Sequence, residues 1–218
     1  MNPNTVKHTR RDFLRTAICA APALALWPGE SVEALAAPTI RPSVDLDFIK
    51  TQLPLKRRAE WTHIEPRPGR LARARVDRYD RITIHHEGCG VNTHTDEQRV
   101  MRNLDGILGW HIRRDFGDIG YHFAIDYAGR VWECRSLGYW GAHVYGHNER
   151  NIGVVLLGNF ERQRPSDAQM ETMEHLVHVL RHHYRVRRGR IYGHVDLGPT
   201  LCPGRYLYPN VQKLNRMA

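Results

Sequence analysis

Short runs of apolar and β-branched residues, separated by glycine-containing breaks, recur along the chain and predict β-strands. The runs cover residues 81–86, 121–126, 130–134, 151–157 and 190–194. The run 151–157 is the most apolar of them, which is typical of a central strand buried on both faces. Tyr127-Ala128-Gly129 separates two of the runs and predicts a hairpin.

A second pattern, with apolar residues three and four positions apart, predicts a helix that begins near Thr95. Val100, Leu104, Ile107 and His111 share one face of this helix. A histidine on an apolar face is either a functional residue or a core residue that bonds to a backbone carbonyl. We expect the core role for His111.

Another helix begins at a capping box formed by Ser166 and Gln169 and runs to about Tyr184. Its buried stripe consists of residues at helical spacing: Met170, Met173, Val177, Leu180 and Tyr184. Three histidines lie roughly opposite this stripe, so we expect them on a solvated face and not in a metal site: His175, His178 and His182. A short helix is expected within residues 44–53, and another from Pro209.

Strands and helices are intermixed, with one hairpin and several longer crossovers. This order predicts an α/β fold with a single domain, in which helices flank a central mixed β-sheet. The 218 residues suit one domain with a short extension. We expect residues 37–80 to form an N-terminal extension and loop, and residues 81–218 to form the domain.

Residues 1–36 follow the three-part plan of an export signal. Arg10-Arg11 before Phe13-Leu14 resembles a twin-arginine signal, and Ala34-Leu35-Ala36 offers a cleavage site. The apolar run between them is too short to span a bilayer, so no stable membrane anchor is expected. Export would place the protein in the periplasm, in the cell envelope or outside the cell; an amphipathic N-terminal helix is the alternative.

The composition adds a net charge of +9 to a hydrophobic fraction of 41%. The charge favours an anionic partner, although a solvated basic surface is the simpler alternative. We expect no nucleic-acid partner, because no long Lys/Arg block with interleaved aromatic residues occurs. Anionic polymers of the cell envelope fit the charge.

Two of the predicted strands end in histidine, at His85 and His194, and a Gly/Pro-containing loop follows His194 and leads to Cys202. Imidazole nitrogen and thiolate sulfur are zinc ligands. Three protein ligands would leave the fourth tetrahedral position open, which is the arrangement of catalytic zinc. The chain has 14 histidines, most of which are expected in solvated or core positions.

Several segments together resemble one family, the zinc-dependent N-acetylmuramoyl-L-alanine amidases, which share a fold with phage T7 lysozyme and the peptidoglycan recognition proteins. The resemblance covers roughly residues 57–215, and the order and spacing of the motifs agree. The matching segments are Arg58-Ala59-Glu60-Trp61, residues 82–86, residues 118–123, Gly141-Ala142-His143, residues 151–154 and residues 193–204.

The resemblance implies roles for individual residues. It assigns His85, His194 and Cys202 to Zn²⁺, and it places Tyr121 and Thr200 at the catalytic site. Phage T7 lysozyme has lysine at the position of Thr200, whereas catalytic recognition proteins carry threonine there. We expect substrate contacts from three further residues: His143, His86 and Asn148.

The resemblance implies hydrolysis of the amide between N-acetylmuramic acid and L-alanine in peptidoglycan or muropeptides. Tyr121 would donate to the tetrahedral oxyanion and Thr200 would orient water or the oxyanion. Glu87 is either an acid/base or a surface-loop residue. The alternatives are a recognition domain that binds peptidoglycan without cleaving it, although such members commonly lack the zinc cysteine, and a zinc peptidase acting on stem peptides.

Two further cysteines remain in the mature chain when Cys202 is assigned to zinc. We expect Cys89 and Cys134 to form a disulfide in an oxidising compartment. Cys134 stands where the family's usual Glu-Gly-Arg turn has glycine, which supports a pair specific to this lineage. The chain is expected to be a monomer.

Overall fold

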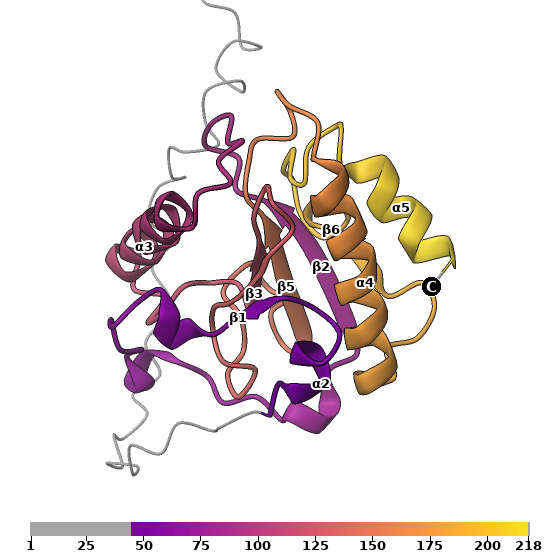
Figure 1. Cartoon of the computed structure of the whole chain (residues 1–218). Coiled ribbons are helices and arrows are strands. Elements are labelled where there is room, and N and C mark those ends of the chain that lie inside the picture. The colour runs from indigo at the N-terminus through magenta and orange to yellow at the C-terminus, as the bar shows by residue number, and fades with distance from the viewer. Residues whose placement is uncertain (1–44, 218) are drawn as a thin grey trace, which may run out of the picture. The chain divides into compact units, whose positions relative to one another are not determined.

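The structure, a computed structural model, describes residues 45–217. The predicted export signal lies outside these residues. A six-stranded mixed sheet forms the centre of the fold, with the strand order β1-β4-β3-β5-β2-β6 (Figure 1). The strands are β1 (Leu55–Lys56), β2 (Arg81–His86), β3 (Phe123–Ile125), β4 (Val131–Glu133), β5 (Asn151–Leu156) and β6 (Ile191–Gly193).

The strand β2 lies between β5 and β6 and is parallel to both. β3 is parallel to β5 and antiparallel to β4, which confirms the predicted hairpin. The predicted α/β fold with a mixed sheet is therefore confirmed. The bounds of β2 agree with the apolar run, whereas the runs before and after the hairpin turn give strands of three residues each.

Helices cover both faces of the sheet (Figure 1). Within residues 45–217 the helices are α2 (Asp47–Lys50), α3 (Glu97–Arg113), α4 (Asp167–Tyr184) and α5 (Tyr208–Met217). Isoleucines 82 and 84 of β2 pack in one apolar cluster with Leu176 of α4 and Val211 of α5. Val155 of the neighbouring strand belongs to a second cluster with residues of α3. Side chains thus alternate between an α4 face and an α3 face of the sheet.

The predicted N-terminal extension contributes to the sheet. Residues 45–80 contain α2, β1 and three short 3-10 helices, Arg58–Glu60, Pro68–Arg70 and Val76–Arg78. The two residues of β1 pair in parallel with β4 at the edge of the sheet. Sequence patterns missed β1 because two residues are too few to show a period.

The predicted caps and helical faces are largely observed. Ser166 and Gln169 form both hydrogen bonds of the capping box at the start of α4. His111 is buried on the inner face of α3, as expected. The observed bond is to an N–H group, whereas a carbonyl was predicted: His111 Nδ1 accepts the backbone N–H of Gly120 at 3.0 Å.

The expected disulfide is not formed in the described part of the chain. Cys134 lies at the end of β4 with its thiol fully buried in the cluster beneath α3, where Sγ lies 3.6 Å from the Trp132 carbonyl oxygen. Cys89 instead lies in an exposed turn after β2. The fold thus places Cys134 in the core and Cys89 at the surface.

No helix within residues 45–217 has the length and apolar character needed to cross a membrane.

Candidate metal centre

The parallel strands β2 and β6 bring two histidines to the same edge of the sheet. His85 lies near the carboxyl end of β2, and His194 directly follows β6. The alternation of side chains along β2 turns His85 away from the α4 cluster that holds Ile84. The His85 side chain is nevertheless buried, with 1% of its surface exposed. The imidazole rings of the two histidines are 4.8 Å apart between centroids.

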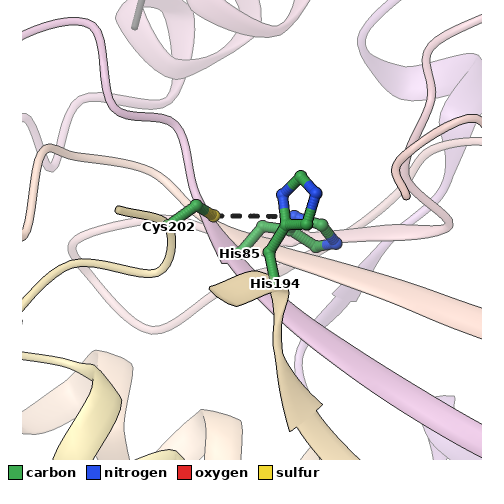
Figure 2. Close-up of side chains that lie close together, drawn as sticks. All are labelled: His85, His194 and Cys202. Atoms are coloured by element: carbon green, nitrogen blue, oxygen red, sulfur yellow. Dashed lines mark hydrogen bonds between the residues drawn. The ribbon is translucent and has the colours of Figure 1, made fainter. Parts of the chain in front are cut away.

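The loop after β6 carries Cys202 back to these histidines. Nδ1 of His85 and Sγ of Cys202 are 3.6 Å apart. One ligand atom from each of His85, His194 and Cys202 lies within 4.8 Å of the others, and this is the only such cluster of three or more His, Cys, Asp or Glu found within residues 45–217. Figure 2 shows the thiol of Cys202 directed toward the two imidazoles.

Short hydrogen bonds fix the loop that presents Cys202. The N–H of Val195 donates to the carbonyl oxygen of Cys202 at 2.7 Å, and the N–H of Cys202 donates to the hydroxyl of Thr200 at 3.1 Å. Asp196 accepts from the N–H of Gly193 and from the hydroxyl of Tyr208. Thr200 therefore lies beside the cysteine, with its oxygen stabilising the loop.

The donor set fits a tetrahedral zinc ion. Ligand atoms at about 2.0–2.3 Å from zinc are about 3.5 Å apart in tetrahedral geometry, close to the distance between His85 Nδ1 and Cys202 Sγ. Burial, followed by the neighbouring His143 and His194, holds the pKa of His85 far below its usual range, so the imidazole is neutral and can coordinate. Burial raises the pKa of the Cys202 thiol to about 12, and the N–H of His86, 3.4 Å from Sγ, acts in the opposite direction. A bound cation would supply the charge that deprotonates this thiol.

Tyr121 lies beside His85 of the candidate metal site. Its ring centroid is 5.1 Å from that of His85. Burial raises the pKa of the Tyr121 hydroxyl, and the neighbouring acidic groups of Cys202 and Glu87 raise this pKa further. The hydroxyl therefore stays protonated at neutral pH and is available as a hydrogen-bond donor.

The three expected substrate-binding residues make contacts within the protein. His143 is buried, with Nδ1 3.0 Å from His85 Nε2 and Nε2 3.2 Å from the carbonyl oxygen of Asn151. The side-chain oxygen of Asn148 accepts the N–H groups of His143 and Val144, both at 2.9 Å.

His86 uses only one ring nitrogen within the described residues. Its Nδ1 accepts the N–H of Phe160 at 3.2 Å, whereas its buried Nε2 has no hydrogen-bond partner in this part of the chain. Because Nδ1 accepts, Nε2 carries the proton of the neutral ring. His86 therefore holds one buried donor without a hydrogen-bond partner among the described residues.

Glu87 lies in a loop contact, and the three histidines of α4 lie on a solvent-exposed face. The carboxylate of Glu87 accepts the N–H of Gly158 at 3.1 Å and lies 3.4 Å from the side-chain nitrogen of Asn92, which joins two loops. His175, His178 and His182 are exposed on α4. The structure thus favours a loop role for Glu87 and a solvated face for the histidines.

The sequence matches the family described as N-acetylmuramoyl-L-alanine amidase over residues 75–205. The chain belongs to this family.

Similar proteins carry both amidase and recognition-protein names. Peptidoglycan-recognition protein SD of Drosophila simulans is 27% identical over 166 residues, covering 76% of this chain and 88% of that protein. The human N-acetylmuramoyl-L-alanine amidase is 32% identical over 134 residues, covering 58% of this chain but only 23% of the human protein. The crystal structure of Drosophila recognition protein SD superposes with a TM-score of 0.67 at 27% identity, covering 74% of this chain and 95% of that structure.

One structural requirement of this amidase-family site was missed in the sequence. Gly153 lies within β5, directly beneath the ring of His143, and a Cβ there would lie 2.5 Å from that ring. A Cβ at Gly141 would lie 2.2 Å from the same ring. A glycine inside an otherwise apolar strand signals such a close approach, and this signal was present at Gly153.

Two further buried histidines support the loops around the site. Burial lowers the pKa of His111 to about 3, with smaller contributions from Arg114 and Arg135. Burial also lowers the pKa of His122 to about 3, against the effect of its bond to the Tyr139 carbonyl. Nδ1 of His122 accepts the N–H of Gly153 at 3.0 Å, so protonation there would break the bond.

These depressed pKa values predict that acid destabilises the protein. The unfolded chain takes up protons near about pH 6.5, whereas the folded histidines stay neutral down to a pH near their own pKa. The stabilising contribution is complete above the unfolded pKa and is lost as the pH falls. Between about pH 7.5 and about pH 5, we expect a loss of ~2 kcal/mol in the free energy of unfolding for each of His111 and His122.

Urea unfolding at the two pH values measures this loss. His111→Gln keeps an acceptor for the N–H of Gly120 but cannot be protonated, so its pH-dependent loss is expected to be smaller by ~2 kcal/mol. His175→Gln makes the same change at an exposed histidine of α4 and is expected to retain the parent's pH dependence. Equal pH dependence in the parent and His111→Gln would contradict this account.

Proposed function

We propose that this protein is a zinc-dependent hydrolase that cleaves the amide between N-acetylmuramic acid and L-alanine in peptidoglycan or its fragments. The convergence of His85, His194 and Cys202 within 4.8 Å carries the proposal. Membership of the N-acetylmuramoyl-L-alanine amidase family supports the choice of bond. When bound by these residues, zinc supplies a Lewis acid that activates water and polarises an amide carbonyl.

Tyr121 and Thr200 are the proposed catalytic side chains. The protonated hydroxyl of Tyr121, beside His85, can donate to the oxygen that becomes negative as the amide carbonyl is attacked. The oxygen of Thr200 accepts from Cys202 N–H, which leaves its own proton free to orient the attacking water or the oxyanion. Among the expected substrate contacts we retain His86, whose Nε2 proton is a buried donor.

A recognition domain that binds peptidoglycan without cleaving it is the second candidate, and the relatives named as recognition proteins favour it. The assay that separates the two is release of L-alanyl amino termini from purified peptidoglycan, with and without a chelator. Zinc-loaded protein that sediments with the wall but releases no amino termini would establish the recognition function.

Cys202→Ser is expected to abolish tight zinc binding and activity, because a serine hydroxyl is a poor ligand compared with a thiolate. Metal analysis of the purified protein should find one zinc per parent chain and less than a tenth of that in Cys202→Ser, roughly what loss of one of three ligands implies. Cys89→Ser, at the exposed cysteine, should keep both zinc and activity. Full zinc occupancy in Cys202→Ser would refute the ligand assignment.

Tyr121→Phe is expected to keep the metal and to lower kcat about 10²-fold, the usual effect of removing one oxyanion donor. Tyr184→Phe is a suitable control, because it removes a buried hydroxyl that has no partner among the described residues. Zinc content and kcat should both be measured for the two variants. A parent-like kcat in Tyr121→Phe would remove this residue from the mechanism.

We also propose export by the twin-arginine route to the periplasm or beyond, on the strength of Arg10-Arg11 before Phe13-Leu14. Replacement of both arginines by lysine should leave the full-length precursor in the cytoplasm, as detected by cell fractionation and immunoblotting. Replacement of Arg57 and Arg67 by lysine is the matched control in the mature chain. Normal processing of the Arg10/Arg11 double variant would exclude this route.

A further inference from the structure

The imidazole of His143 lies between His85, one of the three candidate metal ligands, and the backbone of β5. His85 Nε2 lies 3.0 Å from His143 Nδ1, on the side of the His85 ring opposite to the one that approaches Cys202. His143 Nε2 lies 3.2 Å from the carbonyl oxygen of Asn151. His143 therefore contacts a metal ligand without belonging to the ligand group itself.

The direction of these bonds follows from the carbonyl group. The oxygen of Asn151 can only accept, so His143 Nε2 must carry the proton. In the neutral ring His143 Nδ1 is then a bare acceptor, and it must take its hydrogen from His85 Nε2. His85 Nδ1 is consequently left without a proton, and it is this atom that faces the sulfur of Cys202 at 3.6 Å.

The ring of His143 is held firmly in its place. Gly141 and Gly153 leave room for it, and a Cβ at either position would lie within 2.5 Å of a ring atom. The backbone N–H of His143 is bound by the side chain of Asn148. Asn151, which supplies the carbonyl, begins β5 and pairs with Arg81 of β2. The acceptor for His85 is thus held by β5, which pairs with β2, the strand that carries His85.

We propose that His143 is a positioning residue, which selects the Nδ1-unprotonated tautomer of His85 and orients that nitrogen toward the zinc ion. This proposal rests on the proposed zinc site. It replaces the expected contact between His143 and substrate, because both ring nitrogens are engaged within the protein. Partners of this kind fix the tautomer and orientation of metal-bound histidines in other proteins.

Zinc affinity measured by competition with a chromophoric chelator tests the proposal directly. His143→Leu removes the acceptor and should weaken zinc binding roughly 10- to 100-fold. His143→Gln offers an oxygen to His85 Nε2 and an N–H to Asn151, and it should restore most of that loss. His111→Leu removes a comparably buried histidine outside the chain of bonds and should retain parent-like affinity while lowering stability.

Nitrogen-15 NMR of the imidazoles in zinc-free protein gives a second measurement that does not require activity. The parent should show His85 protonated on Nε2, and His143→Leu should show a mixture of the two tautomers. Parent-like zinc affinity in folded His143→Leu, or a proton on His85 Nδ1 in the zinc-free parent, would overturn the proposal. Failure of the parent to bind zinc would overturn the zinc site, and would do so even where the NMR spectra show the expected tautomer.

Discussion

The parallel pairing of β2 with β5 and β6 is the constraint on which the rest of the site depends. It places Ile82 and Ile84 against α4 while turning His85 to the opposite face. A shift of one residue in this register would exchange the two faces of β2. It would bury His85 among the α4 residues and turn the two isoleucines toward the α3 face. The apolar packing of one face thus determines where the chemistry of the other face can occur.

The two faces of the sheet differ in chemical character near its functional edge. The α4 face is packed with aliphatic side chains, whereas the α3 side contains buried histidines that bond to backbone groups, including His111 and His122. Burying a polar ring costs free energy unless its nitrogens are hydrogen-bonded. Here each Nδ1 accepts a backbone N–H, so neutral histidines serve as acceptors for glycine residues whose own neighbourhood has no space for side chains.

Local patterns predicted the features that depend on local physics. The apolar run 81–86 predicted β2, and Ser166 with Gln169 predicted the start of α4. The positions of His85 and His194 at the ends of predicted strands, with Cys202 in the loop that follows, indicated a group that the fold does bring together. Features set by contacts between distant segments were harder to predict. The position of Cys134 in the core depends on the packing of α3 residues against it and Trp132. The bond from His143 to His85 depends on the path of the loop before β5. Residue periodicity does not encode either of these long-range contacts.

The order of the elements along the chain also determines when His85, His194 and Cys202 can come together during synthesis and folding. β2 is synthesised before α3, the hairpin, β5 and α4, whereas β6 and the loop with Cys202 follow all of them. His85 consequently emerges from the ribosome long before either of its partners. In small zinc-finger domains the ligands lie close together in sequence, and metal binding drives the folding itself. Here the sheet must assemble first, so a cation would meet the complete set of proposed ligands only on a chain whose folding is nearly finished.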